Sequence, residues 1–586
     1  MSRTQRHITT AILASAAGLA LVGARAARPG ATSARAAGPR GGVAAGPSAD
    51  LVLRGGVVFV GDAEGTKARA VAIRGDRILA VGPQAEGLIG PSTRVVELRG
   101  RLVTAGMNDA HLHLGAGGLS MLNVRLEGTT SLARIEARVR EAADAAPSGE
   151  WVTGRGWDHT RLPAAERGPD GWPPRAPLDR AAPDRPVFLK RVDGHTAWVN
   201  GAALRALGID ETTPDPPGGR ILHDPETGEP TGILLENAAD AAEAAIPEPS
   251  DARAMQGLEM ALDVARRTGL TSVQTRVTAR DVRNLESLRR EGRLTLRVYG
   301  WRPLTDEILA TYRRAGITEG FGGPWLRIGA VKAYVDGTLG SRTAWMLEPY
   351  ADDPGTRGIS RIEPETLRRL VLAADSAGLQ VLAHAIGDAA NREVLDIYEE
   401  AARTGPARPR RHRIEHAQVL DAADIPRFAR LGVVASMQPT HATSDMRWAE
   451  ARIGHERAAE GAYAWRSLLD AGAHVAFGTD FAVEPMAPIE GLYSAVTRQS
   501  RERPGEPPSG WLPEQRLDIE EAIRLYTAGS AWAEFEEDRK GRLEPGMLAD
   551  VVVWDRNLLE VPPERLLQAK PDLTIVGGRV VFRRSE

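Results

Sequence analysis

The feature that most constrains the fold of this chain is a series of eight short apolar segments between residues 102 and 481. In chain order they read LVTAGMNDAHLH, GLTSVQT, LTLRVYGW, LRIGAVKAYVDG, GLQVLAHAIGD, RHRIEHAQ, GVVASMQP and AHVAFGTDF. Amphipathic stretches such as PETLRRLVLAADSAG and DAANREVLDIYEEAARTG separate several of them. Eight apolar strands that alternate with helices predict an α/β protein with a (β/α)8 barrel, whose active site lies at the carboxyl ends of the strands.

The sequences around the barrel predict two further structural parts. Residues 50–104 and 541–586 both contain short alternating strands, such as DLVLRGGVVFV and LTIVGGRVVFRR, so we expect the two chain ends to form one composite β-sandwich domain. The barrel then occupies residues 105–540. Residues 117 to about 250 are too long for a βα unit, and we expect them to form an inserted subdomain near the barrel mouth. Its tryptophans are either an apolar wall of the pocket or the core of the subdomain: Trp151, Trp157, Trp172 and Trp198.

The N-terminus predicts export. Residues 1–26 combine the basic MSRTQRH, the apolar ITTAILASAAGLALVGA and a small-residue cleavage site, ARA, as in a secretory signal peptide. Residues 27–49 read as a disordered leader of Ala, Gly, Pro, Arg and Ser. The alternatives are a membrane anchor or a misassigned start, but the apolar core is shorter than the roughly 20 residues of a membrane span. We therefore expect a secreted or extracytoplasmic protein without stable membrane association after cleavage.

The composition of the 586 residues excludes several kinds of site and partner. The chain has no cysteine, so any metal must be held by histidines, carboxylates or less common ligands. A formal net charge of -3 offers no general attraction to nucleic acid. We expect a small-molecule substrate, and the sequence is compatible with a homodimer.

Potential metal ligands lie at the ends of the predicted strands. His111 and His113 end the first apolar segment, and His384, His416 and Asp480 lie late in the fifth, sixth and eighth. A His-x-His pair alone is equally consistent with structural histidines. The full set, in order along the barrel, predicts a site for a divalent metal such as zinc.

Lys332 is an unusual residue in its segment. Only five of the 74 basic residues are lysines, and this one lies in the buried fourth segment, where Val or Ile is expected. One interpretation is an ion pair with Asp336 or with a carboxylate at the barrel floor. Asp336 itself is a second candidate ligand, although we favour a structural or pocket role for it.

Several phrases in fixed order resemble one known superfamily. They are MNDAHLHL, GRGWD, DRPVFLKRVDGHTAWVN, KAYVDGTLGSRTA, AHAIGD, RIEHAQ, FGTDFAVEP and LEPGMLADVVVWD. From about residue 50 to 584 the chain is similar to the amidohydrolase superfamily, and most of all to its YtcJ-like branch, which includes N-substituted formamide deformylase. It departs from the usual lead-in to the first histidine, with Ala105 in place of Pro and with Met107 and Asn108 in place of Phe-Ile.

The resemblance implies a metallo-hydrolase with two divalent ions, expected to be zinc. His111, His113 and Asp480 would hold one ion, His384 and His416 the other, and Lys332, carboxylated to a carbamate, would bridge them together with a hydroxide. Arginine stays protonated and cannot take this role. Asp480 would also move the proton from the attacking hydroxide to the leaving amine.

Other residues at the predicted mouth have less definite roles. His195 is our candidate for stabilising the developing oxyanion, with capping of the next helix as the alternative. Gln438 and His441 follow the seventh segment and either line the pocket or cap a loop.

The reaction we expect is hydrolysis of an amide-type C–N bond in a small molecule. Three alternatives stay open: a lactonase or phosphotriesterase with the same two-metal site, a mononuclear deaminase that lacks the carbamate, and a catalytically silent ligand-binding barrel. The substrate itself is not predicted, because specificity lies in the loops and the inserted subdomain.

Overall fold

The computed structural model describes residues 48–145, 150–192, 194, 196–216 and 219–585. The predicted signal peptide, nearly all of the predicted leader and His195 lie outside these ranges. Pro47–Glu586 form one compact unit, and its described strands make three sheets.

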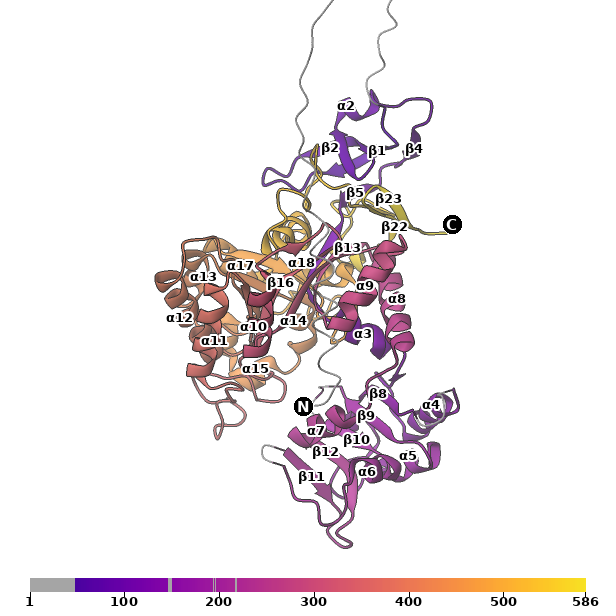
Figure 1. Cartoon of the computed structure of the whole chain (residues 1–586), viewed down its shortest axis with the longest axis vertical. Helices are drawn as coiled ribbons and strands as arrows, with labels where there is room; N and C mark the ends of the chain where they lie inside the picture. Colours follow the sequence, from indigo (N-terminus) through magenta and orange to yellow (C-terminus); the bar gives the residue numbers. More distant parts are fainter. Residues whose placement is uncertain (1–47, 146–149, 193, 195, 217–218, 586) are drawn as a thin grey trace, which may run out of the picture. The chain divides into compact units, whose positions relative to one another are not determined.

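The central sheet is the predicted parallel barrel. Its strands are hydrogen-bonded in the order β20-β19-β18-β17-β16-β14-β13-β6, so chain neighbours are also spatial neighbours (Figure 1). The bounds are β6 (Met107–Leu112), β13 (Leu270–Arg276), β14 (Arg297–Pro303), β16 (Leu326–Tyr334), β17 (Gln380–Ala385), β18 (Arg413–His416), β19 (Val434–Met437) and β20 (His474–Phe477). A short β15 (Phe321–Gly322) pairs antiparallel with β16. All eight predicted strands are confirmed.

The loop after the last barrel strand connects it to the first. The backbone N–H of Asp480 donates to the carbonyl of His111 (2.7 Å). One residue earlier, the Thr479 N–H donates to Oδ1 of Asp109 (3.0 Å). These bonds nearly close the barrel at the carboxyl ends of β6 and β20, where the predicted ligands lie.

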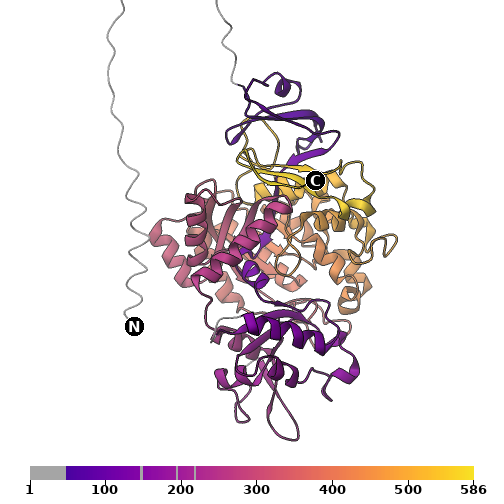
Figure 2. The ribbon, with the colours of Figure 1, turned by 90° about the vertical axis from the view of Figure 1, so that its right-hand side faces the viewer.

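Helices surround the strands in both ribbon views (Figures 1 and 2). The larger ones are α8 (Asp251–Arg267), α9 (Ala279–Arg290), α10 (Asp306–Ala315), α11 (Pro364–Ser376), α12 (Asp388–Thr404) and α18 (Pro488–Thr497). Shorter ones include α3 (Leu114–Met121), α13 (Ile425–Leu431), α14 (Pro439–Asp445), α15 (Ala449–Ile453), α16 (His455–Gly461), α17 (Trp465–Asp470), α19 (Ile519–Arg524) and α20 (Ser530–Ala533). In α12 the buried residues Val394, Ile397, Tyr398 and Ala401 repeat at helical spacing, so one stripe of the helix faces the core.

The flanking sheet is built from both chain ends, as predicted. It comprises β1 (Leu51–Phe59), β2 (Lys67–Arg74), β3 (Arg77–Val81), β4 (Arg94–Glu97), β5 (Leu102–Ala105), β21 (Val551–Trp554), β22 (Pro571–Val576) and β23 (Arg579–Arg583), with α2 (Pro83–Glu86) nearby. The antiparallel pair β5–β21 joins the two ends. A buried ion pair, Arg297 Nε to Asp550 Oδ2 at 2.6 Å, links this sheet to barrel strand β14.

The inserted subdomain lies between α3 and α8. Its six-stranded sheet has the order β11-β12-β10-β9-β8-β7. The strands are β7 (Val124–Arg125), β8 (Val152–Trp157), β9 (Val187–Arg191), β10 (Thr196–Val199), β11 (Gly219–His223) and β12 (Pro230–Glu236), with α4 (Leu132–Ala145), α5 (Ala176–Ala181), α6 (Gly201–Leu207) and α7 (Asn237–Ala245). Trp157 and Trp198 are fully buried and pack 5.6 Å apart, so these two tryptophans belong to its core.

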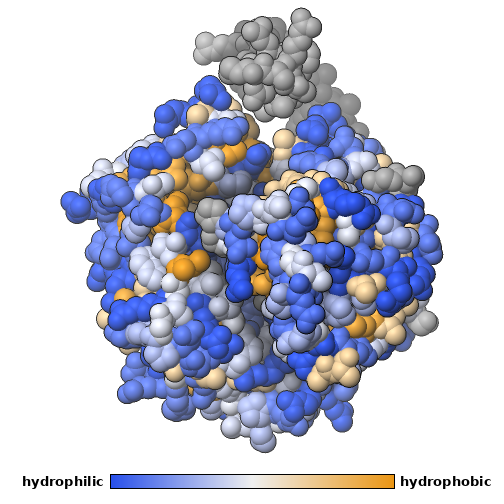
Figure 3. Space-filling view, turned by 90° about the horizontal axis from the view of Figure 1, so that it is seen from below, coloured by the Kyte–Doolittle hydropathy of each residue, from blue (hydrophilic) through white to orange (hydrophobic). Residues whose placement is uncertain are grey.

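Within the described ranges, no helix is both long enough and apolar enough to cross a bilayer. On the face seen in Figure 3, hydrophilic residues predominate and apolar residues are dispersed among them.

Candidate metal centre

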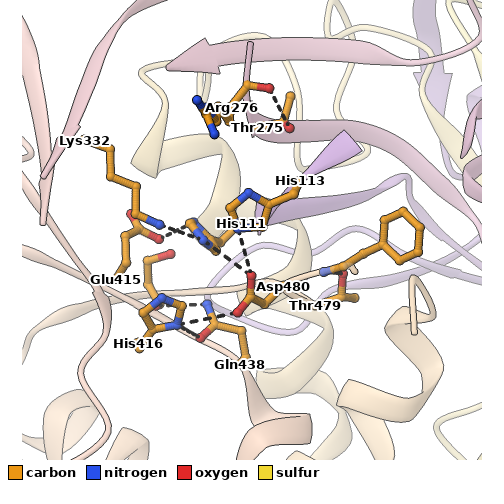
Figure 4. A network of polar contacts seen from close by, with 12 residues as sticks. His111, His113, Thr275, Arg276, Lys332, Glu415, His416, Gln438, Thr479 and Asp480 are labelled. Carbon is orange, nitrogen blue, oxygen red and sulfur yellow. Dashed lines mark hydrogen bonds and ion pairs between the residues drawn. The ribbon is translucent and has the colours of Figure 1, made fainter. Parts of the chain in front are cut away.

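Three buried side chains converge at the carboxyl ends of the barrel strands. Ligand atoms of His111, His416 and Asp480 all lie within 4.8 Å of one another. They come from β6, β18 and the loop after β20, and Figure 4 shows them pointing toward one another. The structure thus brings His111 together with two side chains that lie more than 300 residues further along the sequence.

Two of these residues have left-handed backbone conformations. The φ angle is 76° at His416 and 55° at Asp480, values that non-glycine residues seldom adopt. At the end of β18 this conformation interrupts strand alternation, so that Glu415 and His416, although adjacent, both reach the cluster. Such strained residues concentrate at functional sites.

His113 lies one residue beyond β6, at the N-terminus of α3. Its Nε2 is 3.3 Å from Oδ1 of Asp480, and its ring is 5.4 Å from that of His111. The His113 side chain is 26% exposed, whereas the His111 side chain is not exposed. His113 is therefore the more accessible member of the predicted pair.

The ring of His111 is fixed through its other nitrogen. Its Nδ1 lies 2.8 Å from Oε2 of Glu415, which Arg413 Nε contacts at 2.8 Å through Oε1. Nε2 of His111 faces Oδ1 of Asp480 at 3.6 Å. Burial, and then the charge of Lys332, lower the pKa of His111 to about 4, so the ring is neutral at pH 7. A neutral imidazole whose second nitrogen contacts a carboxylate is the usual form of a metal-ligating histidine.

Lys332 reaches the same cluster from β16. Its Nζ lies 3.0 Å from Nε2 of His111, and the residue is 2% exposed. Burial lowers the pKa of Lys332 to about 8. No ion pair joins it to Asp336 in the described structure, where the Asp336 carboxylate instead accepts backbone hydrogen bonds from Trp345, Ile386 and Gly387. The Asp336 carboxylate thus fixes the loops after β16 and β17, and its Oδ1 also lies 3.5 Å from Nε2 of His384.

His384 is next to the cluster but contacts a different group. Its ring lies 4.6 Å from that of His416, and its Nε2 is 3.0 Å from the Gly337 carbonyl. The His416 ring is also 5.1 Å from that of His111, so His416 lies close to both of these histidines. Burial, followed by the charge of Lys332, lowers the pKa of His384 to about 3.

Gln438 and His441 both contact predicted ligands. Oε1 of Gln438 lies 2.8 Å from Nδ1 of His416. Nε2 of His441 lies 3.6 Å from Oδ2 of Asp480, and its Nδ1 is 3.1 Å from Nε2 of Gln418. The structure therefore favours the pocket interpretation for both residues over loop capping.

Two residues at the site were missed in the sequence. Glu415 fixes His111, and the buried Asp109 accepts hydrogen bonds from the backbone N–H of His111 and from both the N–H and the hydroxyl of Thr479. Burial raises the pKa of Asp109 to about 7. The sequence did hold a signal for these two residues, because ionisable side chains occupy alternate positions of buried strands. The pairs are Asp109 with His111 and Arg413 with Glu415.

A parallel barrel with a buried His/Asp cluster at the carboxyl ends of its strands defines the class of metal-dependent barrel hydrolases. Residues 94–582 match the amidohydrolase family, and the chain belongs to this family.

Individual relatives agree with this assignment. The chain is 34% identical to the putative amidohydrolase YtcJ of Bacillus subtilis, over 91% of this chain and 99% of the relative. It is 28% identical to N-substituted formamide deformylase of Arthrobacter pascens, over 92% and 99% of the two chains. The crystal structure of an uncharacterized metal-dependent hydrolase from Pyrococcus horikoshii OT3 matches with a TM-score of 0.73 and 30% identity, covering 88% of this chain and 99% of that one.

Proposed function

We propose that this member of the amidohydrolase family hydrolyses an amide-type C–N bond in a small molecule. The observation that carries the proposal is the position of the Asp480 carboxylate. Oδ1 lies 3.3 Å from His113 and Oδ2 lies 3.6 Å from His441. The similarity to N-substituted formamide deformylase supports the choice of bond.

The donor set suits a divalent ion. His111, His113 and Asp480 would hold it, since imidazole nitrogen and carboxylate oxygen are among the usual ligands of zinc. Oδ1 of Asp480 is buried and has no hydrogen-bond partner among the described residues, a deficit that a cation would satisfy. When bound, the ion activates a water molecule and polarises the substrate carbonyl.

Asp480 is placed to move the proton. Burial opposes ionisation, but His113, His111 and His416 together hold the pKa of Asp480 well below its usual value. The carboxylate is therefore ionised at neutral pH and can accept a proton from the attacking water. It then delivers this proton to the nitrogen as the C–N bond breaks.

We further propose that Lys332 becomes a carbamate and that a second ion binds at His384 and His416. The buried amine lies beside His111, and its lowered pKa makes the neutral form, which reacts with CO2, accessible. We also propose that His195 stabilises the developing oxyanion. The chain would be exported and its signal peptide cleaved.

The test is a hydrolase screen with zinc-loaded protein. We expect release of amine from N-formyl and N-acetyl amines, with lactones and phosphotriesters turned over more slowly. Asp480→Asn should lower kcat by about 10² or more while retaining most of the zinc. Asp306→Asn, on the outer helix α10, is the matched control. Faster turnover of lactones or phosphotriesters, or no turnover of any substrate, would contradict the proposal.

A further inference from the structure

An exposed arginine lies at the mouth of the barrel beside the metal centre. Arg276 is the last residue of β13, and Figure 4 shows its side chain on the His113 and Lys332 side of the cluster. The preceding residue, Thr275, is buried, and its hydroxyl accepts a hydrogen bond from the N–H of Leu114 (2.9 Å). Because Leu114 follows His113 directly, this bond fixes the end of β13 next to the site.

The Arg276 guanidinium has no acidic partner in the described structure. No described carboxylate lies within 4.0 Å of it, whereas nearby Arg280 pairs with Glu248 at 2.7 Å and with Asp251 at 3.0 Å. At the end of β13 this guanidinium is therefore available to a ligand at the barrel mouth.

A second arginine approaches the same region from another loop. The backbone N–H of Arg361 donates to the carbonyl of Val335 (2.8 Å), just beyond the end of β16. The Arg361 side chain is exposed and, among the described residues, has no carboxylate within ion-pair distance. Arg361 therefore lies beside the carboxyl end of β16, the strand that carries Lys332.

Tyr334, the last residue of β16, lies next to two of the predicted metal ligands. Its ring lies 5.7 Å from that of His384 and 4.8 Å from Nζ of Lys332. Arg276 at the end of β13 and Arg361 beside the end of β16 thus both lie at this edge of the candidate metal centre. Guanidinium binds carboxylate through two parallel hydrogen bonds, which gives direction as well as affinity.

An exposed apolar side chain lies on the loop that follows β20. Val483 is 59% exposed, and its N–H donates to the carbonyl of Asp480 (2.7 Å). A substrate whose scissile carbonyl is at Asp480 could therefore place an aliphatic group against Val483.

We propose that Arg276, with Arg361, forms a carboxylate-binding subsite that selects N-acyl amino acids over neutral amides. This inference rests on the proposed amide hydrolysis and adds the substrate class. Water supplies OH to the acyl carbon and H to the nitrogen as the C–N bond breaks, so an N-formyl amino acid yields formate and the free amino acid. The carboxylate stays on Arg276 throughout.

The experiment compares two substrates that differ only in the carboxylate, N-formylleucine and N-(3-methylbutyl)formamide. We expect the zinc-loaded wild type to prefer N-formylleucine in kcat/KM by about 10- to 100-fold, the range for hydrogen bonds to a charged group. Arg276→Gln should remove most of this ratio, and Arg361→Gln a smaller part. Arg313→Gln, an exposed arginine on α10, should keep the wild-type ratio. A wild-type ratio near one, or a ratio that survives the double variant, would overturn the subsite.

A binding measurement separates this inference from the proposed function. If the wild type hydrolyses no amide, calorimetry with N-acetylleucine and N-(3-methylbutyl)acetamide tests the subsite alone. Binding of the carboxylate at least about tenfold tighter, lost in Arg276→Gln, would support the subsite even though amide hydrolysis had failed. Equal binding of the two compounds would overturn it.

Discussion

Oε2 of Glu415 lies 2.8 Å from Nδ1 of His111, and neither side chain is exposed to solvent. Arg413, equally buried, holds the other Glu415 oxygen at 2.8 Å. This chain of contacts turns Nε2 of His111 toward Asp480. The orientation of His111 in the candidate metal centre is therefore set by two side chains that have no exposed surface.

Glu415→Gln should weaken metal binding. The amide keeps the volume but removes the negative charge that stabilises the ligand, so we expect zinc affinity to fall by about 10- to 100-fold. A competitive chelator titration measures this loss. Glu399→Gln, on the exposed face of α12, is the control, and equal zinc affinity in the two variants would rule out the role of Glu415.

Lys332 can be tested by replacement and rescue. Lys332→Ala should leave at most one ion per chain and little activity, with partial recovery when acetate or propionate and excess zinc are added. Lys332→Arg should not recover, because its permanent charge repels the cations. Zinc analysis together with turnover reports both effects. If the Lys332→Arg variant bound two ions and had normal turnover, the carbamate proposal would be wrong.

The inserted sheet is coupled to the loop that carries Asp480. Nη1 of Arg155, in β8, donates to the carbonyl of Ala482 (3.0 Å). Removing one such bond costs about 0.5 to 1.5 kcal/mol. We expect Arg155→Gln to accelerate hydrogen exchange in residues 480–486 by roughly 2- to 10-fold. Exchange at the wild-type rate would show that the loop holds its position without the inserted sheet.

Asp445 should make stability depend on pH. Burial raises its pKa from 3.8 to about 6, partly offset by His441, Tyr463 and Arg447, while Glu484 adds to the increase. Between these two pKa values the folded protein keeps a proton on Asp445 that the unfolded chain has lost. The stabilisation of the fold by this proton is therefore complete below about pH 4 and is lost as the pH rises through 6.

The matched variant is Asp445→Asn, which can still accept the Tyr463 hydroxyl hydrogen bond. One pKa unit corresponds to about 1.4 kcal/mol, and partial exposure of Asp445 leaves an expected effect of about 1 to 2 kcal/mol. The free energy of unfolding of the variant, relative to wild type, should rise by that amount between pH 4 and pH 7. Parallel curves for the two proteins would show that Asp445 does not titrate in this window.

The barrel, and the meeting of three of the predicted ligands at one end of it, were predictable because strand order and strand ends can be read from apolar runs and turns. The eight strands occur in the predicted order, and His111, His416 and Asp480 meet as strand-end residues should. Glu415 could not be found in this way. In a regular strand, adjacent side chains point to opposite faces, so a strand that directs His416 to the site is not expected to direct Glu415 there too. The left-handed backbone at His416 allows both side chains to reach the site.

The domain boundaries and the role of His195 stay predictions. The tryptophans of the insertion were ambiguous because a buried aromatic residue and a pocket wall leave the same pattern in a sequence. Packing resolves two of them, since Trp157 and Trp198 contact each other in the core.

The most direct test of the metal centre is anomalous scattering at the zinc edge from crystals of zinc-loaded protein. We predict a strong peak with Nε2 of His111, a ring nitrogen of His113 and a carboxylate oxygen of Asp480 at about 2.0 to 2.2 Å. Zinc found only at a surface pair such as His455 and Glu450, with none among these three residues, would contradict the account.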